Sequence, residues 1–294
     1  MALDYRGTTA LITGASSGLG TEFARQLAAR GANLVLVARR LDRLDSLANE
    51  LTASHGITAT TITADLAAPG AAANLHADLG ERGIRISTLI NNAGFGTRSR
   101  FENEAAGRIH EEVSLNVTAL VELTHAFYAQ LQEGRGALVT LASTAAYQPV
   151  PLMAVYAASK AFVLSFTEAL WYENKDTALL VLALSPGATR TEFFDVAGAG
   201  ARVGDFEEPA DVVGLALSTL DSKNPPPSVV SGARNRAMSI ASTLAPRRTV
   251  VNLTGSMTGR NPACGLNDEG VLTTKARHCC AGPSSSVHAV QLWS

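Results

Sequence analysis

Short apolar runs alternate with amphipathic helical patterns along most of this 294-residue chain, and no other feature restricts its fold as much. Continuous apolar runs are typical of strands that are buried on both faces, as in parallel sheets. Parallel strands need long crossover connections, which the intervening helical patterns supply. The alternation therefore predicts an α/β fold with a doubly wound parallel sheet.

The expected elements follow one another without a repeat or a linker before about residue 245. Strands are predicted at 9–13, 33–38, 57–63, 87–91, 137–143, 178–184 and 228–231. Helices are predicted at 19–30, 41–54, 71–82, 103–113, 115–131, 154–173 and 209–220, followed by two short amphipathic segments around Pro246. Residues 1–260 are expected to form one domain. From residue 261 the periodicity is lost, and we expect 261–294 to be a disordered or non-native tail.

A glycine-rich turn joins the first predicted strand to the first predicted helix, with the sequence TGASSGLG. Glycines there allow a tight turn and the close approach of a pyrophosphate, which then lies at the positive end of the helix. The spacing differs from the general dinucleotide fingerprint, and an ordinary turn is the alternative. The candidate cofactor-binding residues of this turn are Gly14, Ser16, Ser17, Gly18, Leu19 and Gly20.

Three polar residues lie at the end of the predicted strand 137–143 and on the helix predicted after it. Ser143 ends that strand, and Tyr156 and Lys160 lie four residues apart, so they share one face of the predicted helix 154–173. A phenol with a pKa near 10 is a poor acid or base at neutral pH, and an adjacent cation would lower that pKa. Because doubly wound sheets bind ligands at the carboxyl ends of their strands, these side chains are candidate catalytic residues. Taken alone, Tyr-x3-Lys also occurs by chance in many helices.

Six motifs occur in the order and at the separations of one known family. They are TGASSGLG, NNAG at 91–94, Asn116 within SLNV, Ser143, the Tyr156–Lys160 pair and SPG at 185–187. On these motifs the chain resembles the short-chain dehydrogenase/reductase family over about residues 5–260. The resemblance implies a single Rossmann-type domain with a seven-stranded parallel sheet and an oxidoreductase activity.

The resemblance also implies roles for the matching residues. Tyr156 would exchange a proton with the substrate, Lys160 would lower the tyrosine pKa and bind the nicotinamide ribose, and Ser143 would hold the substrate oxygen. Asn116 would hold a water that links Lys160 to solvent, although a lone helical Asn is also a common cap or surface residue. Further cofactor contacts would come from Leu66, Asn92, Ala93, Gly94, Pro186, Gly187, Thr189 and Thr191. Asp65 would contact the adenine ring, or it caps a helix that starts at Leu66.

The end of the second predicted strand favours NADP(H) over NAD(H). NAD enzymes of this architecture place an acid there, about 20 residues past the glycine turn, to bind the ribose 2′-hydroxyl. This chain instead has Arg39 and Arg40, with no carboxylate before Asp42. A guanidinium matches a phosphate, so we expect Arg39 to be the main contact with the 2′-phosphate. The alternative is that both arginines are ordinary surface charges.

The substrate is expected to be a small carbonyl compound or alcohol with an apolar body. The segment at about 190–208 is rich in glycine and alanine and is predicted to be a lid over the pocket. Phe95, Val150 and Phe193 are expected to line that pocket beside Ser143, with simple core packing as the alternative. Aliphatic, steroid-like and acyl carbonyl compounds all fit this description.

Composition excludes several other classes of protein. The net charge of −2 and the lack of any Lys/Arg-rich run offer no surface for nucleic acid. The apolar runs fall short of the roughly 18 residues that span a bilayer, and the first residues show no signal peptide. All three cysteines lie at 264, 279 and 280, so the main body has no disulfide framework, and we expect a cytoplasmic protein. No metal site is expected, because His278-Cys279-Cys280 lacks a second ligand pair.

Two helices, 115–131 and 154–173, carry apolar residues on all sides and predict a homodimer or homotetramer. Together they would leave an apolar patch too large for a monomer. In the alternative arrangement, the segments after Gly232 fold back and cover that patch. An idle NADP-binding sensor or scaffold is the alternative function. The intact set of Asn116, Ser143, Tyr156 and Lys160 favours the enzyme, because a scaffold needs no reactive tyrosine.

Overall fold

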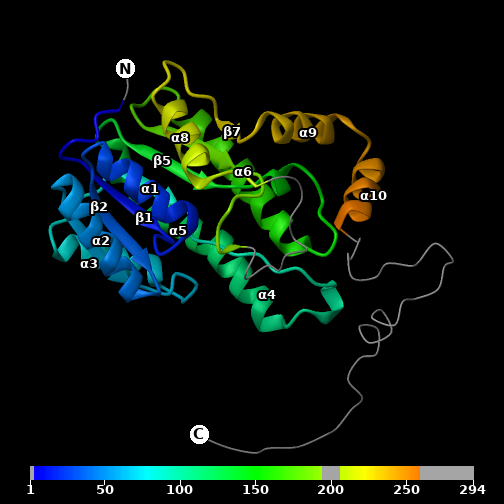
Figure 1. Ribbon diagram of the computed structural model, residues 1–294, viewed down its shortest axis with the longest axis horizontal. Helices are drawn as coiled ribbons and strands as arrows, with labels where there is room; N and C mark the ends of the chain where they lie inside the picture. Colours follow the sequence, from blue (N-terminus) through cyan, green and yellow to red (C-terminus); the bar gives the residue numbers. More distant parts are fainter. Residues whose placement is uncertain (1–2, 194–205, 259–294) are drawn as a thin grey trace, which may run out of the picture.

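The computed structural model describes residues 3–193 and 206–258, which form a seven-stranded sheet with helices on both faces (Figure 1). The strand order is β3-β2-β1-β4-β5-β6-β7, and all six pairings between neighbouring strands are parallel. The order reverses between β1 and β4, and doubly wound sheets bind their ligands at this switch point. The predicted Rossmann-type fold is confirmed.

The observed strands and helices begin and end within three residues of the predicted bounds, except that the helix predicted from residue 115 is α-helical only from Leu120. The strands are β1 (Thr9–Thr13), β2 (Asn33–Ala38), β3 (Ala59–Thr63), β4 (Thr88–Asn91), β5 (Ala137–Leu141), β6 (Leu180–Ser185) and β7 (Ser228–Val230). The helices are α1 (Gly18–Ala29), α2 (Leu41–His55), α3 (Ala71–Glu81), α4 (Ala106–Val113), α5 (Leu120–Gln132), α6 (Ala154–Glu173), α8 (Pro209–Leu220), α9 (Ala233–Leu244) and α10 (Arg247–Thr258). Short 3₁₀ turns form η1 (Phe101–Asn103) and η3 (Thr144–Tyr147).

The structure differs from the sequence expectation between α4 and α5. The two helices are joined without a break by η2 (Ser114–Ala119), a six-residue π-helix. Such single π-turns are rare and are found mostly at functional sites. A π-turn shifts the helical periodicity only once, so the apolar pattern of the sequence did not reveal it.

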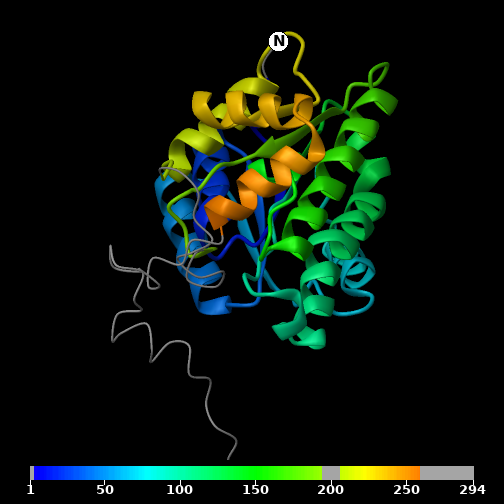
Figure 2. The ribbon, with the colours of Figure 1, turned by 90° about the vertical axis from the view of Figure 1, so that its right-hand side faces the viewer.

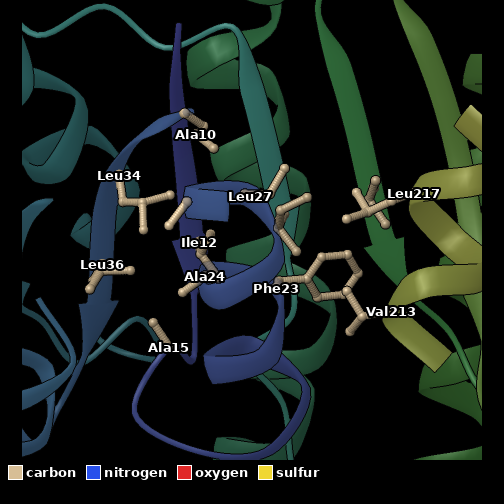
Figure 3. Packing of buried hydrophobic residues seen from close by; sticks show 14 of the residues in the cluster. Ala10, Ile12, Ala15, Phe23, Ala24, Leu27, Leu34, Leu36, Val213 and Leu217 are labelled. Carbon is tan, nitrogen blue, oxygen red and sulfur yellow. The ribbon is translucent and has the colours of Figure 1, made fainter. Parts of the chain in front are cut away.

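The strands place alternate side chains in two separate cores. Ala10 and Ile12 of β1 pack on one face against α1, α2 and α8, whereas Leu11 packs on the other face with α3 and α5. Figure 3 shows the first of these cores, with Phe23 of α1 directed toward Val213 of α8. Because the strands are covered on both faces, they read as continuous apolar runs in the sequence.

Most of the large apolar side chains on α5 and α6 are covered within the subunit. Phe127 of α5 is fully buried, and the indole N–H of Trp171 donates to the Pro225 carbonyl at 3.1 Å. Phe162 and Tyr172 of α6 remain 43% and 61% exposed. The apolar surface left for an oligomer contact is therefore smaller than the sequence alone predicts.

The segments after Gly232 do fold back, and they lie beside the carboxyl edge of the sheet (Figure 2). Ser242 of α9 donates to the Tyr147 carbonyl at 3.3 Å, and Thr254 of α10 donates to the Pro149 carbonyl at 2.9 Å. These contacts place α9 and α10 against η3 and the residues that follow it, which differ from the apolar patch on α5 and α6 that the fold-back alternative would have them cover.

Several sequence expectations fall on parts of the chain that the structure does not describe. Residues 194–205 of the expected lid and the whole expected tail at 261–294, with its three cysteines, lie outside the described residues. Among the described residues, no helix is both long and apolar enough to cross a membrane. The same residues contain no cluster of three or more metal-binding side chains.

The buried ring of Phe127 provides a test of the packing. Replacing Phe127 by Ala should lower the free energy of unfolding by about 3–5 kcal/mol, because the side chain is fully buried and leaves a cavity. Phe101→Ala is the matched control, since Phe101 is 67% exposed and its loss should change stability by about 0.5 kcal/mol or less. Denaturant unfolding measures both, and equal midpoints for the two variants would contradict the packing.

Candidate active site

A cavity of about 680 Å³ opens at the carboxyl edge of the sheet, and residues that follow each of the seven strands contribute to its wall. The sequence-predicted residues that line it are Gly14, Ser16, Ser17, Gly18, Leu19, Arg39, Arg40, Asp65, Leu66, Asn92, Ala93, Gly94, Phe95, Ser143, Val150, Tyr156, Lys160, Pro186, Gly187, Thr189, Thr191 and Phe193. The fold thus brings together groups that lie up to 179 residues apart in the sequence. Gly20 and Asn116 do not line the cavity and support the residues that do.

The glycine turn after β1 is shaped by close backbone contacts. Gly14 has a φ of +65°, a left-handed conformation that favours glycine. A Cβ on Gly20 would lie 2.3 Å from the Gly14 carbonyl oxygen, so only glycine fits there. Helix α1 begins at Gly18 beside the cavity, and its free N–H groups and positive dipole end suit an anion.

Hydrogen bonds fasten the turn after β4 to the end of β1. The Thr13 hydroxyl accepts the backbone N–H groups of Asn92 and Ala93, each at 2.9 Å. In return, the Asn92 side-chain amide donates to the carbonyls of Thr13 at 2.8 Å and Gly14 at 3.2 Å. The two turns therefore form one unit at the switch point of the sheet.

Ser143, Tyr156 and Lys160 come together at the end of β5. Lys160 is buried, and its ammonium donates to the Leu141 carbonyl at 2.6 Å. The Lys160 Nζ lies 5.8 Å from the centre of the Tyr156 ring. The Ser143 hydroxyl interacts with the Tyr156 phenol and also accepts the N–H of Ala145 at 3.1 Å.

Burial controls the pKa values of this group. Desolvation raises the pKa of Tyr156 to about 12, while the hydrogen bond with Ser143 opposes this rise and the charge of Glu112 adds to it. Desolvation lowers the pKa of Lys160 to about 8, and the same Glu112 opposes that fall. The tyrosine pKa is therefore raised, contrary to the sequence expectation, because the cost of burying a phenolate outweighs the hydrogen bond with Ser143.

Glu112 itself was not identified from the sequence. It lies on α4, is completely buried, and accepts a hydrogen bond from the Thr97 hydroxyl at 2.6 Å. Burial raises the pKa of this carboxyl group. In sequence, Glu112 is one of two adjacent acids on a polar helix, which gave no signal of burial.

Asn116 lies in the π-helix η2 and connects the turn after β4 with α6. Its Oδ1 accepts the Phe95 N–H at 3.1 Å, and its Nδ2 donates to the Phe95 carbonyl at 2.8 Å and to Ser159 Oγ at 3.1 Å. Both amide hydrogens are thus used within the protein, so the structure gives Asn116 a positioning role. The water link to Lys160 stays a prediction.

The two arginines after β2 differ in their surroundings. Arg40 donates to the Ser16 hydroxyl of the glycine turn at 3.1 Å and to Glu192 at 2.9 Å. The Arg39 side chain is 67% exposed and reaches Glu111 at 3.4 Å. Both line the cavity, but the packing favours Arg40, and not Arg39, as the arginine fixed next to the glycine turn.

Comparison with known proteins agrees with this geometry. The family model for short chain dehydrogenases matches residues 8–200. The chain belongs to the short-chain dehydrogenase family. It is 33% identical to human 17-beta-hydroxysteroid dehydrogenase type 3 over 63% of this chain and 60% of that protein. It is 38% identical to sulfoacetaldehyde reductase 2 of Chromohalobacter salexigens over 62% of this chain and 73% of that protein.

A solved structure of a family member covers nearly the whole chain. The short-chain dehydrogenase of Sphingobium yanoikuyae in complex with NADPH superimposes with a TM-score of 0.73 and 30% identity, covering 97% of this chain and all of that one. By contrast, the match spans only about 60% of the length of the 17-beta-hydroxysteroid dehydrogenases.

The sequence did not indicate some of the residues that line the cavity of this short-chain dehydrogenase, and one alternative that it offered for Asp65 is incorrect. Cavity-lining residues that the sequence did not indicate include Met238, Leu253 and Met257. They lie on α9 and α10, whose position depends on tertiary contacts. The alternative role of Asp65 as a helix cap is wrong, since α3 begins only at Ala71. Asp65 instead accepts the N–H of Ala67 at 3.1 Å in a local turn.

Proposed function

We propose that this chain is an NADP(H)-dependent oxidoreductase that interconverts a carbonyl and a secondary alcohol on an apolar small molecule. The observation that carries the proposal is the convergence of Ser143, Tyr156 and Lys160 in the same cavity as the glycine turn and the start of α1. The named relatives act on steroids and on sulfoacetaldehyde, which supports a shared type of reaction rather than a shared substrate.

The residues present fit a phosphate-bearing dinucleotide. The start of α1 lines the cavity and supports an anion there, and a larger side chain at Gly20 would strike the Gly14 carbonyl and distort the turn that shapes this site. Arg40, fixed against Ser16, supports a preference for the additional 2′-phosphate of NADP(H). When bound, this cofactor would donate or accept the hydride. The glycine-turn residues would hold its phosphates, and Lys160 would hold the nicotinamide ribose.

In reduction, the protein would supply the proton and the place for the oxygen. Ser143 would hold the substrate carbonyl oxygen by a hydrogen bond, and Tyr156 would give that oxygen its phenolic proton as hydride reaches the carbonyl carbon. The cation of Lys160 would stabilise the phenolate left behind. Oxidation uses the same groups in reverse, with Tyr156 taking the proton from the alcohol.

The substrate body would lie against an apolar wall. Phe193 packs against the Tyr156 ring with a centroid separation of 5.2 Å, and Phe95 lies beneath Arg108. Val150 lines the same cavity, and α9 and α10 add Met238, Leu253 and Met257. This wall supports a substrate with an aliphatic, steroid-like or acyl body.

Tyr156→Phe tests the proposed acid. The variant should bind NADPH as the native chain does, while turnover with a responsive ketone or aldehyde falls by roughly 10²–10⁴, the usual effect of a lost general acid. NADPH oxidation across a carbonyl panel provides the assay, and Tyr172→Phe, at a 61% exposed tyrosine, is the matched control. A Tyr156 variant with more than half the native rate would refute the role. NADPH binding by the native chain without turnover on any carbonyl would favour the sensor or scaffold.

The pH dependence follows from the buried lysine. Lys160 is a cation below its pKa of about 8 and is neutral above it, while Tyr156 stays protonated up to about 12. The kcat/KM for reduction should therefore fall as pH rises through about 8. Since the charge of Glu112 raises the Lys160 pKa, Glu112→Gln should move this fall to lower pH. A native profile that stays flat to about pH 10 would contradict the assignment.

Arg40→Ala and Arg39→Ala together test the cofactor preference. Arg40→Ala should weaken NADPH binding by about tenfold or more, since hydrogen bonds to charged groups contribute about 1.5–3 kcal/mol, and should leave NADH binding nearly unchanged. Arg39→Ala should have the smaller effect because its side chain is more exposed. Calorimetric titration of both cofactors decides between them, and the reverse ranking would restore Arg39 as the main contact.

We also propose that α5 and α6 form a homodimer or homotetramer contact. Phe162 stacks on Phe166 at 5.9 Å between ring centres and is 43% exposed, which supports a partner surface on α6. Light scattering at micromolar concentration should then give at least twice the 30.6 kDa chain mass. Phe162→Glu should shift the mass toward the monomer. A monomer for the native chain would rule out this contact.

A further inference from the structure

Two arginines at the start of α2 close on a single carboxylate at the edge of the cavity. Arg40 donates from Nη1 to Glu192 Oε2 at 2.9 Å, and Arg43 donates from Nη1 to Glu192 Oε1. Arg40 also contacts Ser16 of the glycine turn through Nε and Nη2. The two guanidinium groups thus bind the two oxygens of one anion. Arginine side chains bind phosphate oxygens with the same geometry.

The carboxylate in this clamp is ionised and displaceable. The hydrogen bond from Arg43 and the neighbouring Arg40 lower the pKa of Glu192, so it is an anion at neutral pH. All three side chains are between 41% and 45% exposed. Ion pairs with this much solvent contact contribute little net free energy, so a stronger anion can replace the carboxylate. A phosphate monoester carries up to about two negative charges and three acceptor oxygens.

We propose that Glu192 is a cofactor-specificity residue, an internal anion that competes with the 2′-phosphate of NADP(H) for Arg40 and Arg43. This inference rests on the proposed function and adds Arg43 to the phosphate-binding groups. NADP(H) must displace Glu192 to bind, whereas NAD(H), which has no anion at this position, leaves the clamp closed. Glu192 therefore reduces the preference for NADP(H) that the arginines alone would give.

The position of Glu192 in the chain links the clamp to the substrate side of the cavity. The preceding residue, Thr191, packs against the glycine turn, where a Cβ on Gly18 would lie 3.0 Å from it. The following residue, Phe193, packs against the Tyr156 ring. Displacement of Glu192 by a phosphate thus acts on a segment that contacts both subsites.

Glu192→Gln tests the competition, because it keeps the size of the side chain and removes its charge. The variant should bind NADPH about 2- to 10-fold more tightly, the range expected for losing two exposed ion pairs to a competitor. Its affinity for NADH should change by less than twofold. The same gain should appear for 2′-AMP and be absent for 5′-AMP, since only the first places a phosphate at the 2′ position.

Two further variants separate this effect from general electrostatics. Glu111→Gln removes the same charge from the partner of Arg39, and it should leave the NADPH to NADH affinity ratio close to native. Arg43→Ala should weaken NADPH binding several-fold and spare NADH. Unchanged or weaker NADPH binding by Glu192→Gln would overturn the inference, since Glu192 would then merely orient the arginines. Failure of the native chain to bind either dinucleotide would instead refute the proposed function and, with it, the inference.

Discussion

The candidate site depends on a single buried hydroxyl between the first and fourth strands. Thr13 Oγ accepts two backbone N–H groups from the turn after β4 and donates to the Ile90 carbonyl at 3.3 Å. Without this acceptor, two N–H groups at the switch point would lose their partner, which is costly wherever water cannot replace it. Because the glycine turn and the turn leading to Phe95 are joined here, the anion cradle and the tyrosine side of the cavity keep a fixed relative position.

Burial at the site works against the chemistry that the residues are proposed to perform. A shielded pocket raises the pKa of Tyr156 and lowers that of Lys160, so each group is held closer to its neutral form. The charge of Glu112 raises both pKa values, although Glu112 lies on α4, a helix that does not line the cavity. It thereby helps to keep the lysine charged, and at the same time it makes the phenolate harder to form. The pKa values of Tyr156 and Lys160 therefore depend on Glu112 as well as on the motif residues themselves.

The sequence predicted the sheet well because burial on both faces leaves a simple record of continuous apolar runs. The sequence also predicted that the motif residues lie near one another, since their spacing matches a known family and the fold brings the strand ends together. Sequence patterns failed where a property depends on tertiary contacts: the depth of Glu112, the anchoring of Arg40 on Ser16, and the clamp at Glu192. The cavity-lining faces of α9 and α10 were missed for the same reason. The cellular location and the oligomeric state stay predictions.

The π-turn between α4 and α5 fixes the phase between the site and the core. Asn116 lies within the turn, and Phe127 lies on α5, the helix that follows it, with its side chain in the core between α5 and the sheet. Each residue in a helix advances the side-chain direction by about 100°. Removing one residue from the turn would let the helix continue with regular geometry, yet it would rotate either the asparagine or the core face out of alignment. In this segment a change of length is therefore more damaging than most changes of residue, and the six-residue turn acts as a spacer whose length is under constraint.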